Sequence, residues 1–151
     1  MAMFTNQKKD LIKRTKANLD FIDQEKKAGN KGVYETTQLF NSLLGIIVNI
    51  KEEEIDFVNF KKIILTDVVK KEWSIPKEIN ADNLGDFINN LRNSIAHIDI
   101  TFTPDNTGEI ASLTFKDSIK GKWEYIITIG EMRNFLNKLC EYIEKYFASV
   151  Q

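Results

Sequence analysis

The stretch of sequence that decides the fold is DNLGDFINNLRNSIAH, residues 82–97. Its apolar side chains recur every three or four positions, which is the period of an amphipathic helix. At 100° per residue, all of them lie within about 60° of the first one. The apolar stripe consists of Leu84, Phe87, Ile88, Leu91 and Ile95. We predict a helix that runs from Ala81 or Asp82 to His97 and buries this stripe. Asn80 or Asp82 is the expected N-terminal cap.

The other side of this helix carries asparagine where surface helices usually carry Lys, Glu or Arg. Asn90 lies just beyond the polar side, and Arg92 lies beside the apolar stripe at about 80° from Leu84. The residues roughly 140° to 220° from Leu84 are Asp86, Asn89, Asn93 and His97. A hydrogen-bonding interface or a binding groove would explain such a face, and neutral drift of a polar surface is the alternative.

The composition is that of one ordinary globular domain, residues 1–151. It is 42% hydrophobic and 28% charged, and the chain shows no repeat or linker. The single cysteine, Cys140, falls in an apolar helical pattern, which predicts a buried and inert thiol. The chain has no signal-peptide core at residues 1–9 and no apolar run of about 18 residues that would span a bilayer. We therefore expect a cytoplasmic protein with no membrane contact.

The N-terminal half of the chain is predicted to be helical. A first helix is expected over residues 6–27, ending at the glycines of 29–32, and a second over 33–48. Residues 55–69 are ambiguous, because their β-branched content favours extended chain, and we interpret them as a helix that ends before Pro76. The apolar stripes are Leu11, Thr15, Leu19 and Ile22 in the first helix, and Leu39, Phe40, Leu43, Leu44 and Ile47 in the second.

After His97 the period changes from helical to alternating, which predicts strands. Three alternating runs, the first two separated by a turn at 104–108, predict an antiparallel meander. Thr128 and Glu131 have the spacing of a capping box, and a long apolar helical stripe from Met132 to Phe147 follows. The apolar members of the strands are Ile98, Ile100 and Phe102; Ala111, Leu113 and Phe115; and Trp123, Tyr125, Ile127 and Ile129. The expected fold is mainly α: a bundle of four or five helices, with the three-stranded meander between the 82–97 helix and the last one.

The net charge of −1 excludes a global basic field of the kind that holds nucleic acid non-specifically. Any contact with RNA has to be local. Four lysine pairs would offer local phosphate contacts, although charged pairs on helices usually belong to a solvated surface. These pairs are Lys8-Lys9, Lys26-Lys27, Lys61-Lys62 and Lys70-Lys71.

The chain lacks the residues that the chemistry of several enzyme classes requires. One histidine and one cysteine cannot build a structural zinc site of the usual ligand type. The chain has no Gly-rich phosphate loop and no Gly-x-Ser-x-Gly elbow. We therefore expect chemistry without a metal or a cofactor.

The segment Arg92-Asn93-Ser94-Ile95-Ala96-His97 resembles the Arg-Asn-x-x-x-His form of the motif that defines the HEPN family, in which four to six residues separate arginine from histidine. The apolar run 39–48 and the strand-helix segment 123–147 are similar to a small bacterial branch of that family. The resemblance implies a helical bundle, so the predicted meander departs from the minimal family fold. It also implies a metal-independent endoribonuclease, often a toxin or a phage-defence protein, that assembles as a homodimer with two motifs facing each other.

The chemistry of the three motif residues is compatible with this resemblance. Metal-free RNA cleavage requires deprotonation of a 2′-hydroxyl, stabilisation of the phosphorane charge and protonation of the leaving oxygen. His97 can exchange protons near neutral pH, Arg92 can hold phosphate oxygens, and Asn93 can orient either partner. One chain offers one such proton-transfer group, whereas a symmetric dimer offers two.

We therefore expect a homodimeric HEPN-type ribonuclease with Arg92, Asn93 and His97 as catalytic residues, RNA as substrate, and an antitoxin or other regulatory protein as partner. The alternative is a catalytically silent interaction module of the same fold. In that case Arg92 forms a salt bridge, Asn93 caps a neighbouring helix and His97 closes its own helix. The near-zero net charge mildly favours this alternative.

Overall fold

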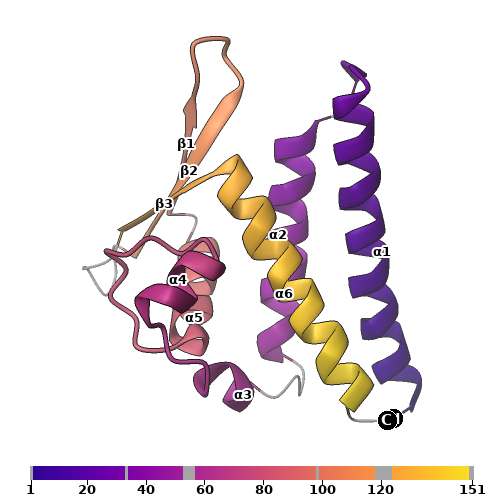
Figure 1. The fold of residues 1–151 in the computed structure, drawn as a ribbon, viewed down its shortest axis with the longest axis vertical. Helices are drawn as coiled ribbons and strands as arrows, with labels where there is room; N and C mark the ends of the chain where they lie inside the picture. The colour runs from indigo at the N-terminus through magenta and orange to yellow at the C-terminus, as the bar shows by residue number, and fades with distance from the viewer. Residues whose placement is uncertain (1, 33, 53–56, 98, 118–123, 150–151) are drawn as a thin grey trace. The chain divides into compact units, whose positions relative to one another are not determined.

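A computed structural model describes residues 2–32, 34–52, 57–97, 99–117 and 124–149. Within these ranges the chain forms six helices and one three-stranded antiparallel sheet (Figure 1). The prediction of a mainly α fold with a small meander before the last helix is confirmed. The chain divides into two compact units, Met1–Ile46 with Leu136–Gln151, and Ile47–Phe135. The single domain expected over residues 1–151 stays a prediction.

The first unit is built from α1 (Ala2–Lys27), the first part of α2 (Glu35–Glu52) and the last part of α6 (Ile129–Ser149). In Figure 1, α1 and this part of α6 run side by side, and Lys16 Nζ lies 3.6 Å from Glu144 Oε2 between them. The core of the unit comes from one face of each helix. Its buried residues are Ile12, Leu19, Leu39, Leu43, Ile46, Leu136, Leu139, Cys140 and Ile143.

Two details of α1 differ from the prediction. The helix begins at Ala2 rather than at Asn6, because residues 2–5 contain no helix breaker. Its buried face is also rotated. Ile12 and Leu19 are buried, seven residues apart and therefore on one side of the helix, whereas Leu11 is 42% exposed.

In the second unit, the helix predicted over residues 55–69 is wrong. The chain instead forms two short helices, α3 (Phe57–Lys61) and α4 (Asp67–Glu72), while residues 55 and 56 lie outside the described part. Between them Ile64 forms an isolated antiparallel β-bridge with Asn83. Ile64 thus adopts the extended conformation that β-branched residues favour, whereas Val58, Val68 and Val69 lie in the two short helices.

Next to this bridge, α3 packs against α5 (Leu84–Ala96) at a glycine. A Cβ atom on Gly85 would lie 2.7 Å from Lys61 Cγ and 3.1 Å from the backbone nitrogen of Lys61. The close approach of the two helices therefore depends on the missing side chain.

The sheet consists of β1 (Ile100–Pro104), β2 (Ile110–Lys116) and β3 (Glu124–Thr128), in the order β1-β2-β3. Residues that pair across antiparallel strands share a face. One face is apolar, and the other carries mainly threonine and serine. The apolar face consists of Ile100, Phe102, Leu113, Phe115, Tyr125 and Ile127.

The strand predictions need three remarks. Ile98 and Trp123 lie outside the described residues. Ala111 is exposed rather than on the buried face. Ile129 begins α6 instead of continuing β3, because the capping box forms: Thr128 N donates to Glu131 Oε2 at 2.9 Å, and Glu131 N donates to Thr128 Oγ1 at 3.2 Å.

The tip of the β1–β2 hairpin projects away from β3 and α5 (Figure 1). Its predicted turn is held by Asp105 Oδ1, which accepts hydrogen bonds from Thr107 N at 2.7 Å and Thr107 Oγ1 at 2.6 Å. These hydrogen bonds lower the pKa of the Asp105 carboxyl group. Gly108 completes the turn with a φ of 86°, which favours glycine.

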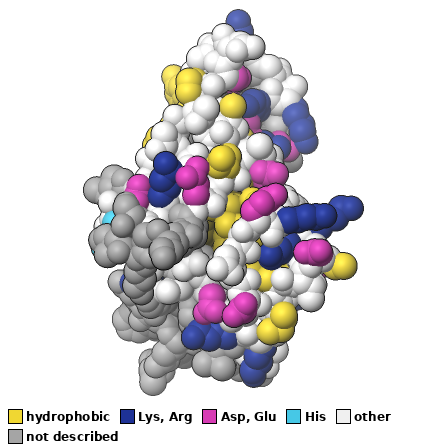
Figure 2. Space-filling model, turned by 90° about the vertical axis from the view of Figure 1, so that its left-hand side faces the viewer, with side chains coloured by type: hydrophobic (Ala, Val, Ile, Leu, Met, Phe, Trp, Pro, Cys, Tyr) yellow, Lys and Arg dark blue, Asp and Glu magenta, His cyan; other side chains and the backbone are white. Residues whose placement is uncertain are grey.

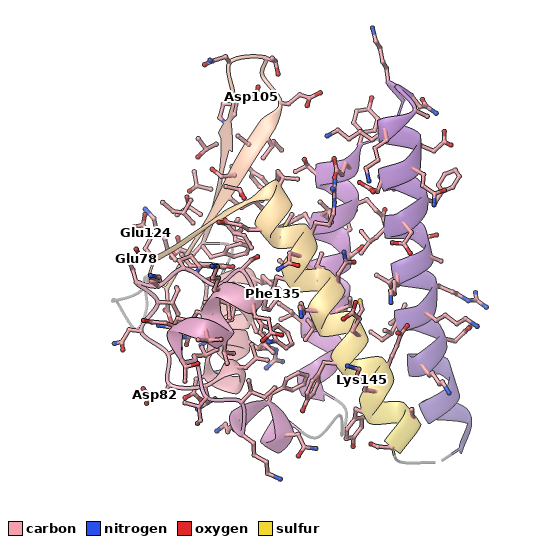
Figure 3. All side chains as sticks on the ribbon, viewed as in Figure 1. Glu78, Asp82, Asp105, Glu124, Phe135 and Lys145 are labelled. Carbon is pink, nitrogen blue, oxygen red and sulfur yellow. The ribbon has the colours of Figure 1, made fainter. Side chains whose placement is uncertain are left out.

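An aromatic cluster joins the elements of the second unit. The Phe87 ring on α5 meets the rings of Tyr125 and Phe135 edge to face, at centroid distances of 5.0 and 5.6 Å. Trp73, which follows α4, meets Phe135 at 5.9 Å, and Figure 3 shows Phe135 on α6 among side chains of α4 and α5. The cluster therefore fixes α5 against β3 and the start of α6.

The hydroxyl group of Tyr125 has no hydrogen-bond partner among the described residues. Burial, and then the negative charge of Glu131, raise the pKa of Tyr125 well above its ordinary value, so the hydroxyl stays protonated.

We expect Tyr125→Phe to increase the free energy of unfolding by about 1 kcal/mol, because it removes a buried polar group that lacks a partner and keeps the ring. Denaturant unfolding measures this change. The matched control is Tyr34→Phe, since Tyr34 is 75% exposed and its substitution should leave stability unchanged. A loss of stability in Tyr125→Phe would mean that the hydroxyl is hydrogen-bonded after all.

Candidate active site

The helix that carries the motif begins later than predicted. Its N-terminal cap is Asn83, not Asn80 or Asp82: Asn83 Oδ1 accepts a hydrogen bond from Asp86 N at 2.9 Å. The chain before it cannot be helical, because Leu84 N donates to Ile63 O in the β-bridge. The cap also accounts for one asparagine of this region, which leaves three on the polar side of the helix.

The apolar side of α5 is buried almost as predicted. Ile95 is only half-buried, and two residues outside the predicted stripe, Gly85 and Ser94, are buried as well. The buried members of the predicted stripe are Leu84, Phe87, Ile88 and Leu91. The buried apolar side therefore orients α5 in the core, and the polar side of the helix is only partly exposed.

The three predicted site residues lie at the C-terminal end of α5. Arg92 and Asn93 are half-buried, and His97 is exposed. His97 is the C-terminal cap, and its backbone N–H donates to Asn93 O at 3.0 Å. His97 is therefore exposed at the terminus of the helix.

Helix geometry brings only two of these residues to the same side. Asn93 and His97 are four residues apart, so they lie on the same side of the helix, one turn from each other. Arg92 lies about 140° around the axis from His97 and about 7.5 Å along it. Asn89 and Asn90 are half-buried on the same polar side as Asn93.

Sequence reasoning missed Ser94, which lies inside the motif and is buried. Its hydroxyl donates a hydrogen bond to Lys116 O, at the end of β2, at 2.5 Å. A signal was present: helix geometry places position 94 about 80° from Leu84, beside the apolar stripe, where a polar residue needs a hydrogen-bond partner.

Several lysines of the pairs noted in the sequence have acidic or backbone partners in the structure. Lys26 and Lys27 form ion pairs at 2.6 and 2.7 Å with Glu35 and Asp23. Lys70 Nζ donates to two backbone carbonyl groups at 3.0 and 2.9 Å. Figure 2 shows acidic and basic side chains interspersed on the face that it displays. The two alternatives for the lysine pairs, an ordinary solvated surface or local phosphate contacts, stay open.

Metal binding, membrane insertion and the single thiol were the other features to consider within the described ranges. Those residues contain no group of three or more His, Cys, Asp or Glu that could hold a metal ion. None of the helices described is long and apolar enough to cross a bilayer. Cys140 is buried, as predicted, and burial raises the pKa of its thiol to about 11. Its inertness stays a prediction, with which the raised pKa agrees.

The structure thus combines a mainly α fold with Arg-Asn-x-x-x-His at the end of an amphipathic helix, which is the combination that the resemblance to the HEPN family implies. The family model that matches the chain is described as HEPN pEK499 p136 and covers residues 1–149, so the chain belongs to this family. No curated protein and no solved structure matches the chain.

We expect Asn83→Ala to lower the free energy of unfolding by about 1 kcal/mol, because it removes the cap of the motif helix. Thermal melting measures the loss. Asn80→Ala is the matched control: Asn80 is exposed and does not cap the helix, so its melting temperature should stay at the wild-type value. Equal losses in both variants would contradict the assignment of the cap.

Proposed function

We propose that the protein is a metal-independent endoribonuclease of the HEPN type that acts in the cytoplasm. The observation that carries the proposal is the position of the motif in a chain of this family: His97 is exposed at the end of α5, with Asn93 and Arg92 half-buried in the preceding turn. An exposed imidazole can reach a polymeric substrate that does not fit a closed pocket.

Each motif residue has a distinct role in the proposed reaction. His97 transfers the proton of the 2′-hydroxyl or of the leaving oxygen. Arg92 holds the non-bridging phosphate oxygens with its planar, permanently charged guanidinium group. Asn93 lies on the same side of α5 as His97 and orients the substrate or the imidazole. The attack of the 2′-oxygen on phosphorus releases the 5′-oxygen and leaves a 2′,3′-cyclic phosphate.

The proposed active site is shared by two copies of the chain. The reaction needs both a base and an acid, and one chain contains one histidine. Within one helix, Arg92 and His97 diverge by about 140°. A second copy that packs on the polar side of α5 supplies a second motif. The asparagines there would hydrogen-bond across such an interface.

A ribonuclease of this kind requires restraint in its own cell. We therefore include an antitoxin or another regulatory protein as a partner, and a role as a toxin or in phage defence. This part of the proposal rests on family membership and on the resemblance of the motif. RNA has to be held by local contacts, because the net charge is −1.

The purified protein should cleave single-stranded RNA in the presence of EDTA, because none of the proposed roles involves a metal ion. The products should end in a 2′,3′-cyclic phosphate or a 3′-phosphate. Gel electrophoresis and end-group analysis of the fragments test this expectation. Cleavage that requires Mg²⁺ and leaves 3′-hydroxyl ends would contradict it.

His97→Ala and Arg92→Ala should each reduce RNA cleavage by roughly a hundredfold or more, the scale of losing an acid-base or charge-stabilising group. Both should melt near the wild-type temperature, because neither side chain belongs to the buried side of α5. Light scattering should show a dimer for the wild type and for both variants. Cleavage rate and melting temperature are measured on the same preparations.

The control for this comparison is Arg14→Ala, which removes an exposed arginine of α1 that pairs with Asp10 and should leave cleavage unchanged. If the motif were structural, each substitution would instead cost about 1 to 3 kcal/mol of stability. Unchanged cleavage in His97→Ala, or a strictly monomeric protein, would defeat the proposal. A catalytically silent interaction module would then be the remaining function of the family fold.

A further inference from the structure

Ser94 is the one buried residue of the motif, residues 92–97. Its side chain has 0% exposure, although both neighbours in the sequence are half-buried. It lies on the flank of the apolar stripe opposite to Arg92. Ser94 is therefore oriented toward the core, and the proposed chemistry makes no direct use of it.

Two hydrogen bonds join Ser94 to Lys116 and Asp99, and a third joins Asp99 to Lys116. The Ser94 hydroxyl donates to Lys116 O at 2.5 Å. Asp99 N donates to Ser94 O at 2.9 Å, and Lys116 N donates to Asp99 O at 2.9 Å. The three residues thus form a closed ring of hydrogen bonds between the last turn of α5, the start of β1 and the end of β2.

His97 lies inside the segment that this ring closes. Ser94 is held three residues before it and Asp99 two residues after it. The imidazole itself is exposed, so packing of its own side chain does little to hold it. The ring holds the backbone at Ser94 and at Asp99, the described residues that flank His97 at a distance of three and two positions.

We propose that Ser94 is a positioning residue that holds His97 for RNA cleavage. This inference rests on the proposed function, since it assumes that the position of His97 matters for a reaction. A serine suits the role because its side chain is small enough for the helix end to approach the strand and still donates a hydrogen bond. A displacement of a catalytic group by about 1 Å can cost a factor of about 100 in rate.

The test compares Ser94→Ala with Ser42→Ala. Ser42 is also a buried serine on a helix and accepts a hydrogen bond from Gln38 Nε2 at 3.4 Å, but it belongs to the first unit, whereas the motif belongs to the second. Because His97 is the only histidine, its imidazole gives one assignable pair of ring signals in NMR spectra. Both variants are studied well below their melting temperatures, so that loss of folded protein does not affect the result.

In Ser94→Ala we expect the His97 ring signals to move or broaden, and kcat to fall by roughly 10- to 100-fold with KM unchanged. In Ser42→Ala both readouts should match the wild type. Ring signals that stay in place in folded Ser94→Ala, or that change equally in Ser42→Ala, would overturn the inference. A fall in cleavage without a change in the signals would overturn it too.

Two further results are informative. If Ser94→Ala does not fold, Ser94→Cys, which fills nearly the same space with a weaker donor, is measured in the same way and decides the question. If the wild-type protein cleaves no RNA, the proposed function fails, and unchanged His97 signals in Ser94→Ala would then refute the positioning role as well. Changed signals in that case would keep Ser94 as the residue that holds His97.

Discussion

The packing of Phe87 is the constraint on which the second unit depends. Its ring contacts Tyr125 of β3 on one side and Phe135 of α6 on the other, and both contacts are edge to face. A buried phenylalanine in such a position contributes on the order of 3 to 5 kcal/mol relative to alanine. Because Phe87 belongs to α5, the same contacts that join the sheet to α6 also determine which side of α5 is buried. The burial of Phe87 therefore also determines the direction in which the opposite, polar side of α5 faces, with Asn93 and His97 on it.

Both ends of α5 are held independently of this cluster. At the start, the β-bridge between Ile64 and Asn83 keeps the chain extended until the cap forms. At the end, Ser94 and Asp99 connect the last turn to β2. A helix held at both ends by buried or backbone hydrogen bonds presents its terminal side chains with little freedom, which is the preorganisation that a catalytic site requires. The tip of the β1–β2 hairpin takes no part in the hydrogen bonds that hold the two ends of α5.

The sequence predicts those parts of the fold that depend on neighbours along the chain. The stripe of α5 and the capping box at Thr128 and Glu131 are local patterns, and both are present in the structure. The cap at Asn83 was predicted at the wrong residue, because it depends on a bridge to Ile64, 19 residues earlier. The break between α3 and α4 has the same origin. In the candidate site, the side of α5 that carries Asn93 and His97 could be predicted from the helical period. The bond from Ser94 to Lys116 could not, since it joins residues 22 positions apart.

The β-bridge at Asn83 also fixes the residue at which the motif helix begins, and with it the length of the helix. Its 13 residues, Leu84–Ala96, run between the isolated β-bridge of Ile64 and Asn83 at one end and the hydrogen-bonded ring of Ser94, Asp99 and Lys116 at the other. One inserted residue would turn everything after it by about 100°. Either the apolar stripe would then no longer face the aromatic cluster, or His97 would no longer keep its present orientation relative to the sheet. In this chain the distance from arginine to histidine is therefore tied to the length of the whole helix, and evolution could change one only by rebuilding the other.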